Sequence, residues 1–248
     1  MCTFEPYEGE SGKDVVWFPS SPVLVDRMLD LARVTSNDVV IDLGSGDGRI
    51  VVAAAKRGAR ALGIEYNPDM VELSQYNAER EDMGERAQFM QADLFDADLS
   101  QATVIITYLL PALNLKLRPK ILGLKPGTRV VCNLFGMGAW AADETACIDA
   151  RDGYMDSCSA HLWIVPARVE GEWKGSTGDV ALVQRFQMIS GSLRTNAGLQ
   201  MLDGKLRGDE ISFNAGGAAY TGRVNGLSID GTVTCGGNAS KWTAIRTN

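Results

Sequence analysis

The chain has 248 residues, of which 45% are hydrophobic and 22% charged, which is the composition of a globular protein and excludes a disordered or fibrous one. Its net charge of −7 is uneven, because residues 1–160 hold 15 Lys and Arg against 24 Asp and Glu, whereas residues 161–248 hold 9 against 7. An acidic first part disfavours nucleic acid as a partner and favours a positively charged ligand.

In chain order, residues 20–34 predict an amphipathic helix with Ser21 as its N-cap and Pro22 in its first turn. From residue 38 to residue 135, short β-branched runs alternate with helical patterns, which is typical of βα units in a parallel sheet. The predicted strands are residues 38–43, 61–65, 87–91, 103–108 and 129–135. Of the predicted helices between them, one begins near Asp47, one extends from about Pro68 to Arg80, and one runs through Leu113, Leu117 and Ile121.

The character of the sequence changes after about residue 166. Of the 27 glycines, 14 lie in the last 88 residues, and short alternating runs recur between turn signals. The predicted strands are residues 179–187, 191–194, 200–206, 210–213, 219–224, 227–233 and 242–246. Because each is too short to be stable alone, we expect a small all-β antiparallel barrel or sandwich. The sequence therefore predicts two domains, residues 1–166 and residues 167–248.

The cysteines and the single histidine limit the chemistry. Five scattered cysteines without a CxxC pair favour neither a disulfide framework nor a zinc site, so we expect a reducing, cytoplasmic location. One histidine, His161, cannot build a metal cluster, and its apolar surroundings favour an ordinary strand position. The longest apolar run, residues 50–55, is far shorter than the roughly 18 residues of a membrane span, and the acidic N-terminus does not resemble a signal peptide.

A glycine-rich loop, residues 42–49 (DLGSGDGR), lies between the first predicted strand and the next helix, where a ligand can approach backbone amides. It does not match the dinucleotide pattern GxGxxG, because Arg49 stands at the third glycine position. Asp42 and Asp47 would also repel a pyrophosphate, by about 4 kcal/mol at a separation of about 4 Å and an effective dielectric constant of about 20. A cationic ligand such as S-adenosyl-L-methionine reverses that sign.

Two further acids extend the predicted pocket. Glu65 ends the second strand, where a carboxylate can accept hydrogen bonds from both hydroxyls of a ribose. Asp93 follows the third strand and suits the amino group of adenine, with Leu94 near the ring. Capping of the following turn explains Asp93 equally well.

These motifs together resemble the class I S-adenosylmethionine-dependent methyltransferases. More narrowly, residues 17–165, about three-fifths of the chain, resemble the seven-strand protein-lysine methyltransferases, including the broad-specificity archaeal and the mitochondrial enzymes. The segments that carry the resemblance are WFPSSPVLVDRMLDLA, VVIDLGSGDGRIVVAAA, LSQATVIITYLLPALNLKLRPKI, LKPGTRVV and the turn at residues 138–140. The resemblance implies a Rossmann-like, doubly wound α/β sheet of seven strands, ending in an antiparallel pair at residues 144–149 and 161–165. The C-terminal β region has no counterpart in that family.

The resemblance also implies the site residues. The cofactor contacts would be Trp17, Pro19, Ser20, Asp42, Gly44, Ser45, Gly46, Asp47, Glu65, Tyr66, Asp93 and Leu94. Thr107 and Tyr108 would form the floor near the transferred methyl group. Tyr108 is the candidate that orients the acceptor amine, although a tyrosine packed at a strand end with its hydroxyl in solvent fits as well. The Pro-Thr of the family is Pro19–Ser20 here, which bears on the acceptor more than on the cofactor.

Methyl transfer requires that two reactants be positioned, which contributes roughly 7 to 11 kcal/mol, and needs no covalent nucleophile. A lysine acceptor must first lose its proton, at about 4.6 kcal/mol for a pKa near 10.4 at pH 7, and a neighbouring cationic cofactor lowers that pKa. We therefore expect a methyltransferase that modifies protein lysines and has neither nucleic acid nor membrane as a partner.

Alternatives stay open within and outside this function. They are a methyltransferase with a small-molecule or nucleic-acid acceptor, and a cofactor-binding protein without turnover. The motif for base amino groups, Asn/Asp-Pro-Pro-Tyr/Phe, is absent at residues 108–111, and the displaced glycine with the two loop carboxylates disfavours an NAD-dependent oxidoreductase. The sequence does not decide the oligomeric state or the role of the C-terminal domain.

Overall fold

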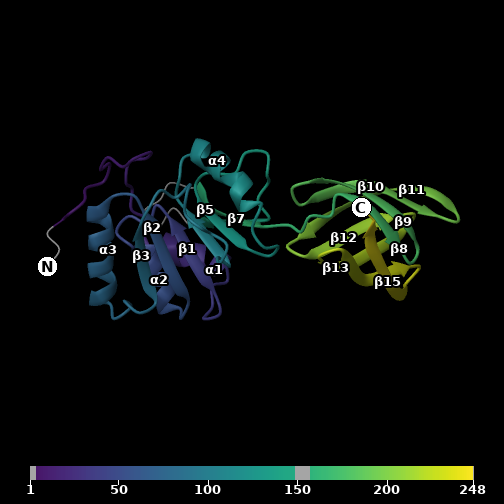
Figure 1. The fold of residues 1–248 in the computed structure, drawn as a ribbon, viewed down its shortest axis with the longest axis horizontal. Helices are drawn as coiled ribbons and strands as arrows, with labels where there is room; N and C mark the ends of the chain where they lie inside the picture. Colours follow the sequence, from purple (N-terminus) through teal and green to yellow (C-terminus); the bar gives the residue numbers. More distant parts are fainter. Residues whose placement is uncertain (1–3, 149–156, 248) are drawn as a thin grey trace. The chain divides into compact units, whose positions relative to one another are not determined.

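The computed structural model describes residues 4–148 and 157–247 of the chain. It contains two compact units, one of Met1–Leu124 with Thr128–Trp163 and the other of Lys125–Gly127 with Ile164–Asn248. Figure 1 shows the first unit in purple to teal and the second in green to yellow. The elements up to the end of the first unit are α1 (Pro22–Leu31), β1 (Val39–Leu43), α2 (Arg49–Lys56), β2 (Arg60–Glu65), α3 (Pro68–Arg80), β3 (Ala87–Gln91), β4 (Val104–Thr107), α4 (Pro111–Ile121), β5 (Arg129–Asn133), β6 (Glu144–Ile148) and β7 (Ser157–Ile164).

The first unit is built on a seven-stranded sheet with the order β3-β2-β1-β4-β5-β7-β6. Strands β1 to β5 pair in parallel, and β6 pairs antiparallel with β7. This arrangement confirms the expected Rossmann-like methyltransferase fold. The strand order reverses between β1 and β4, and ligands of open α/β sheets bind beside the carboxyl ends of the strands at such a point.

Local sequence explains where the helices begin. The Ser21 hydroxyl accepts a hydrogen bond from the backbone of Leu24 at 3.2 Å, and Pro22 occupies the first turn of α1, as expected. Helix α3 begins in the same way, with Asn67 as its N-cap and Pro68 after it. The central strand β4 is buried along its whole length, because helices cover both faces of a parallel sheet.

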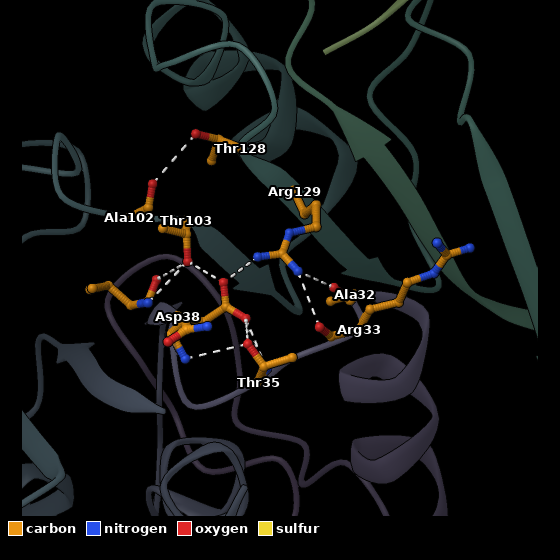
Figure 2. A network of polar contacts seen from close by, with 10 residues as sticks. Ala32, Arg33, Thr35, Asp38, Ala102, Thr103, Thr128 and Arg129 are labelled. Carbon is orange, nitrogen blue, oxygen red and sulfur yellow. Dashed lines mark hydrogen bonds and ion pairs between the residues drawn. The ribbon is translucent and has the colours of Figure 1, made fainter. Parts of the chain in front are cut away.

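A polar network at the amino-terminal edge of the sheet joins β1, β4 and β5 to the end of α1 (Figure 2). Asp38, just before β1, accepts hydrogen bonds from the Thr103 hydroxyl at 2.7 Å and the Thr35 backbone at 2.8 Å, and it forms an ion pair with Arg129. Burial raises the pKa of Asp38, but these hydrogen bonds and the Arg129 charge outweigh it and hold the pKa below its usual value. Arg129 also donates to the carbonyl of Ala32 at 2.6 Å.

The second unit contains the strands β8 (Gly171–Gly175), β9 (Gly178–Arg185), β10 (Met188–Thr195), β11 (Gly198–Arg207), β12 (Glu210–Ala215), β13 (Ala218–Asn225), β14 (Ser228–Cys235) and β15 (Asn238–Thr247). Each strand pairs antiparallel with the next, and β15 pairs with β8, so the sheet closes on itself. The expected barrel or sandwich is therefore a closed barrel. Strand β8 was not among the strands expected from sequence, because it has only five residues and both its first and its last residue are glycine.

The barrel interior is filled by large side chains, among them Trp173, Phe213, Tyr220 and Trp242. Phe213 stacks on Tyr220 with ring centroids 4.7 Å apart, and the Trp242 ring meets both rings edge-on. The interior of the barrel is thus a packed core and not an open channel.

A five-residue pattern, apolar-x-Gly-x-apolar, recurs in four barrel strands. It is centred on Gly191, Gly204, Gly222 and Gly231, and the apolar residue on either side of each glycine is buried. A Cβ atom at Gly204 would lie 2.1 Å from the carbonyl oxygen of Ser212. Only glycine allows the neighbouring strand to approach this closely, which lets the small barrel bend.

The cysteines differ in part from the expectation. Cys147 in β6 is disulfide-bonded, whereas Cys132 and Cys235 are free thiols. Local spacing does not report strand pairing, and the register of β6 and β7 places Cys147 opposite Cys158. The disulfide of Cys147 therefore departs from the expectation of reduced cysteines. Within the described ranges, the helices are too short or too polar to cross a membrane.

Candidate functional site

A cavity of about 360 Å³ lies at the carboxyl-terminal edge of the parallel strands. One wall is the N-terminal strap, which we define as residues 9–20. The remaining walls come from the ends of the strands and the loops that follow them, with residues from 42–50 at the end of β1 and beyond, 64–70 at the end of β2 and beyond, 92–94 after β3, 108–113 after β4, and Phe135 after β5. Every site residue expected from the sequence lines this cavity, except Gly46 and Thr107.

Gly46 and Thr107 have other positions. A Cβ atom at Gly46 would lie 2.4 Å from the indole nitrogen of Trp17, so Trp17 packs directly on the glycine loop. Thr107 is fully buried, and its hydroxyl donates to the sulfur of Cys132 at 3.1 Å. Thr107 therefore links β4 to β5 and does not line the cavity, whereas the adjacent Tyr108 does.

The glycine loop is fixed to the end of β2. The backbone amides of Gly44 and Ser45 donate to the carbonyl of Ile64 at 2.8 and 3.2 Å. Gly48 has a φ of 81°, and a Cβ atom there would lie 2.7 Å from the Phe89 ring, so both conformation and space require glycine. The loop therefore holds one conformation, which leads directly into the first turn of α2.

Glu65 is held by three backbone amides. Its carboxylate accepts hydrogen bonds from Tyr66 at 2.8 Å, Asn67 at 3.0 Å and Gly46 at 3.0 Å. The oxygen that meets Gly46 carries one of these bonds and retains a lone pair for a further donor. Such a carboxylate fits a ribose hydroxyl.

Asp42 is the most unusual ionisable group of the cavity. It is 2% exposed, and within the described part of the chain one of its carboxylate oxygens has no hydrogen-bond partner. Burial, followed by the negative charges of Glu65 and Asp47, raises the pKa of Asp42 to about 8. The hydroxyl of Ser45 also lacks a partner among these residues. Unsatisfied buried acceptors are costly, so the site fits a ligand that brings positive charge and donors.

Asp47 does not face the ligand as a free negative charge. The guanidinium of Arg49 binds its carboxylate through two nitrogens, with Nε to Oδ1 at 2.9 Å and Nη2 to Oδ2 at 2.6 Å. Sequence reasoning used Arg49 only as the residue that breaks the dinucleotide pattern and missed this pairing. Two residues so close together at the start of a helix carry no sequence signal that predicts such a pair.

Asp93 is also engaged. Its carboxylate accepts from the Phe95 backbone at 2.9 Å and binds Lys13 of the N-terminal strap. The Lys13 hydrogen bond, together with that from Phe95, lowers the pKa of Asp93. The Lys13 ammonium also lies 4.9 Å from the centre of the Tyr66 ring. Lys13 is 80 residues from Asp93 in sequence and outside every recognised motif, so it was not predicted.

The other end of the cavity is apolar. Tyr108, Leu109 and Leu110 follow β4, and Phe135 follows β5. The buried side chain of Asn114 in α4 donates to the carbonyls of Leu109 at 3.3 Å and Phe135 at 3.4 Å, which joins the two loops. These side chains give this end of the cavity an apolar lining.

Comparison with known proteins places these features in a family. A family model described as the ANTKMT methyltransferase domain matches residues 42–144. A protein-lysine N-methyltransferase of Saccharolobus islandicus is 37% identical over 61% of this chain and 94% of its own length. An adenine nucleotide translocase lysine N-methyltransferase of Mus musculus is 34% identical over 54% of this chain, which spans 55% of that protein.

A solved structure points to the same fold. It is an RNA methyltransferase from Salinibacter ruber in complex with S-adenosyl-L-homocysteine, with 45% identity and a TM-score of 0.57. The likeness covers 61% of this chain and 96% of that one.

Proposed function

Because the chain belongs to the class I S-adenosylmethionine-dependent methyltransferases, we propose that it methylates the side-chain amine of lysine residues in proteins. The observation that carries this proposal is the 37% identity to the archaeal protein-lysine N-methyltransferase over 94% of that protein. The mouse relative, which is named for a lysine of the adenine nucleotide translocase, points to the same acceptor group.

The cavity residues fit the cofactor. Asp42, with its unsatisfied buried oxygen, would receive the positively charged methionine end. Glu65 would hold the ribose hydroxyls, while Asp93 and Leu94 would hold adenine once Asp93 shares or releases Lys13. Gly44, Ser45, Asp47 and Tyr66, together with Trp17, Pro19 and Ser20 of the N-terminal strap, would complete the walls. When bound, S-adenosylmethionine supplies a methyl group activated by the adjacent sulfonium.

The acceptor would enter at the apolar end. The buried Leu109, with Leu110 and Phe135, gives this end an apolar lining, and a desolvated ammonium loses its proton more readily than one in bulk water. The Tyr108 hydroxyl would orient the amine toward the cofactor. The chain needs no covalent nucleophile for an in-line displacement, so positioning is the main contribution of these residues.

RNA methylation is a second candidate, because the Salinibacter ruber protein, 45% identical, is described as an RNA methyltransferase. Against it stands the charge of the cavity wall, where Glu10, Asp14 and the cofactor-site acids outnumber Lys13 and Arg49. A phosphate backbone would be repelled there. A protein or small-molecule acceptor without nucleic acid or membrane, and a cytoplasmic location, stay predictions.

One experiment separates these functions. The full-length protein is incubated with methyl-labelled S-adenosylmethionine and a cell extract, and the products are divided by protease, by RNase and by a small-molecule filter. We expect label that protease releases and that acid hydrolysis identifies as methyllysine. Label that RNase removes would establish the second candidate, and label that passes the filter would show a small-molecule acceptor. The variant Asp42→Asn serves as the background.

A further inference from the structure

Arg49 makes contacts beyond its ion pair with Asp47. Its third guanidinium nitrogen, Nη1, donates to the backbone carbonyl of Ser20 at 2.9 Å. The guanidinium carbon also lies 5.9 Å from the centre of the Trp17 ring. One side chain at the first turn of α2 therefore binds the glycine loop and two points of the N-terminal strap, which is 29 to 32 residues away in sequence.

The strap needs such an attachment. Within residues 9–17 it forms its own small hairpin, with Gly9 donating to Trp17, Trp17 donating to Glu10, and an isolated bridge between Ser11 and Val16. These bonds hold the hairpin together but do not bind it to the sheet.

Among the described residues, polar attachments between strap and sheet are found at two places. Lys13 binds Asp93 at the adenine end of the cavity, where the proposed ligand must compete for the same carboxylate. Arg49 and the packing of Trp17 on Gly46 act at the other end. The Arg49 attachment uses a backbone carbonyl and a carboxylate that is already neutralised, so it does not depend on whether a ligand is bound.

We propose that Arg49 is a positioning residue, which fixes Trp17 and Ser20 of the N-terminal strap against the glycine loop and thereby completes the wall of the cofactor cavity. Its role rests on the proposed cofactor site and is independent of the acceptor.

The chemistry of the side chain supports this role. The planar guanidinium offers five donors in a fixed fork, so it can bind a carboxylate through two nitrogens and a carbonyl through a third. Lysine keeps the charge but can hold only one of these contacts well. The surroundings differ from an ordinary surface ion pair, because Asp47 is 15% exposed whereas the partners of Arg57, Asp26 and Asp30, are 71% and 63% exposed.

The test compares Arg49→Lys with Arg57→Lys. Arg57, just after the end of α2, is the matched control because the same substitution also removes a guanidinium that binds carboxylates. Binding of S-adenosylhomocysteine is measured by calorimetry, and hydrogen exchange is measured for peptides that cover residues 14–24. We expect Arg49→Lys to weaken binding about tenfold or more and to speed exchange in the strap, with KM for the cofactor raised more than kcat is lowered. Arg57→Lys is expected to leave binding and strap exchange unchanged.

Two outcomes would overturn the inference. One is unchanged affinity in Arg49→Lys, and the other is weaker binding without faster exchange in the strap, which would mean that Arg49 acts on the ligand through Asp47 alone. Failure of the wild-type protein to bind S-adenosylhomocysteine would instead defeat the proposed cofactor site.

Trp17→Ala, which leaves the Arg49–Asp47 ion pair in place, gives a second test of the strap, and a double-mutant cycle with Arg49→Lys compares the two residues. Both residues act through the same segment, so the two losses of affinity should not add. Additive losses would contradict the proposed role.

Discussion

The backbone amide of Gly46 donates a hydrogen bond to the Glu65 carboxylate at 3.0 Å, so the loop after β1 and the acid at the end of β2 form one hydrogen-bonded unit. The same carboxylate accepts from Tyr66 and Asn67. Its orientation is therefore set by the backbone before any ligand arrives, and binding need not order it.

Glu65→Gln tests this arrangement. The amide cannot accept at both ends, so it places an N–H₂ group against a backbone donor and loses a charged acceptor for ribose. We expect the affinity for S-adenosylhomocysteine to fall roughly 10- to 100-fold, since hydrogen bonds to charged groups contribute about 1.5–3 kcal/mol. Calorimetry measures the loss. Glu79→Gln, on the exposed surface of α3, is the control, and equal affinity in both variants would contradict the role of Glu65.

Cofactor binding should depend on pH through Asp42. The pKa of this buried acid in the free protein is about 8, raised by burial and then by Glu65 and Asp47. A cationic ligand favours the ionised form, so below pH 8 binding must release a proton. We expect affinity for S-adenosylmethionine to rise between pH 6 and pH 8, by at most about tenfold per pH unit, and then to level off. Calorimetry in two buffers of different ionisation enthalpy would detect the proton. A pH-independent affinity would be incompatible with this account.

Asp42 should also lower stability in the free protein. Its folded-state pKa lies above the unfolded value of 3.8, so the unfolded chain ionises first as pH rises. The free energy of unfolding is therefore highest below about pH 4, and it decreases as pH rises to about 8. Asp42→Asn removes that dependence. We expect its melting temperature, without cofactor, to exceed that of the wild type by a margin that grows from pH 5 to pH 8 and stays constant above. Identical margins at every pH would show that the carboxylate is already ionised.

The network around Asp38 should stabilise the sheet. Arg129→Met leaves the buried Asp38 without its charged partner, and we expect a loss of about 2–4 kcal/mol in the free energy of unfolding. The acidic partners of Arg57 are exposed, so Arg57→Met should lower the free energy of unfolding by less than about 1 kcal/mol. The lowered pKa of Asp38 adds stability above about pH 4 that disappears as pH falls further. Asp38→Asn should partly rescue Arg129→Met, and the absence of rescue would argue against the ion pair.

The glycine pattern of the barrel can be tested at Gly204. A methyl group there would meet the Ser212 carbonyl at 2.1 Å and the Phe213 Cβ at 2.5 Å. We expect Gly204→Ala to destabilise the barrel by about 1–3 kcal/mol and leave cofactor affinity unchanged. Hydrogen exchange in β11 and β12 would report the loss. Asp203→Ala, at the adjacent exposed position, is the control, and equal protection in both variants would refute the requirement for glycine.

Much of the sheet could be predicted because its signals are local. The bounds of α3 agree with the sequence prediction at both ends, since Pro68 begins the helix and its apolar spacing continues to Arg80. The acids that follow β1 and β2 were found in the same way, from a glycine loop and a strand end.

What the sequence did not show depends on distant contacts. Lys13 meets Asp93 from 80 residues away, and Thr107 is turned from the cavity by Cys132 in the neighbouring strand. Neither a motif nor a periodicity encodes such meetings. The two-domain boundary at residue 166 likewise stays a prediction, and we propose that residues 1–166 bind cofactor without the barrel. The test is to delete residues 171–248 and titrate the remainder with S-adenosylhomocysteine, and we expect its affinity to be largely kept. A collapse in affinity while the remainder stays folded would contradict this proposal.

The amino-terminal ends of the parallel strands carry the stabilising polar network and their carboxyl-terminal ends form the cavity, and this separation has an evolutionary consequence. Substitutions around Arg129 alter how many molecules are folded, whereas substitutions at the opposite edge alter what each folded molecule recognises. A lineage that adapts to heat can therefore change positions around Arg129 and leave unaltered the cavity, where Asp42 couples recognition to stability.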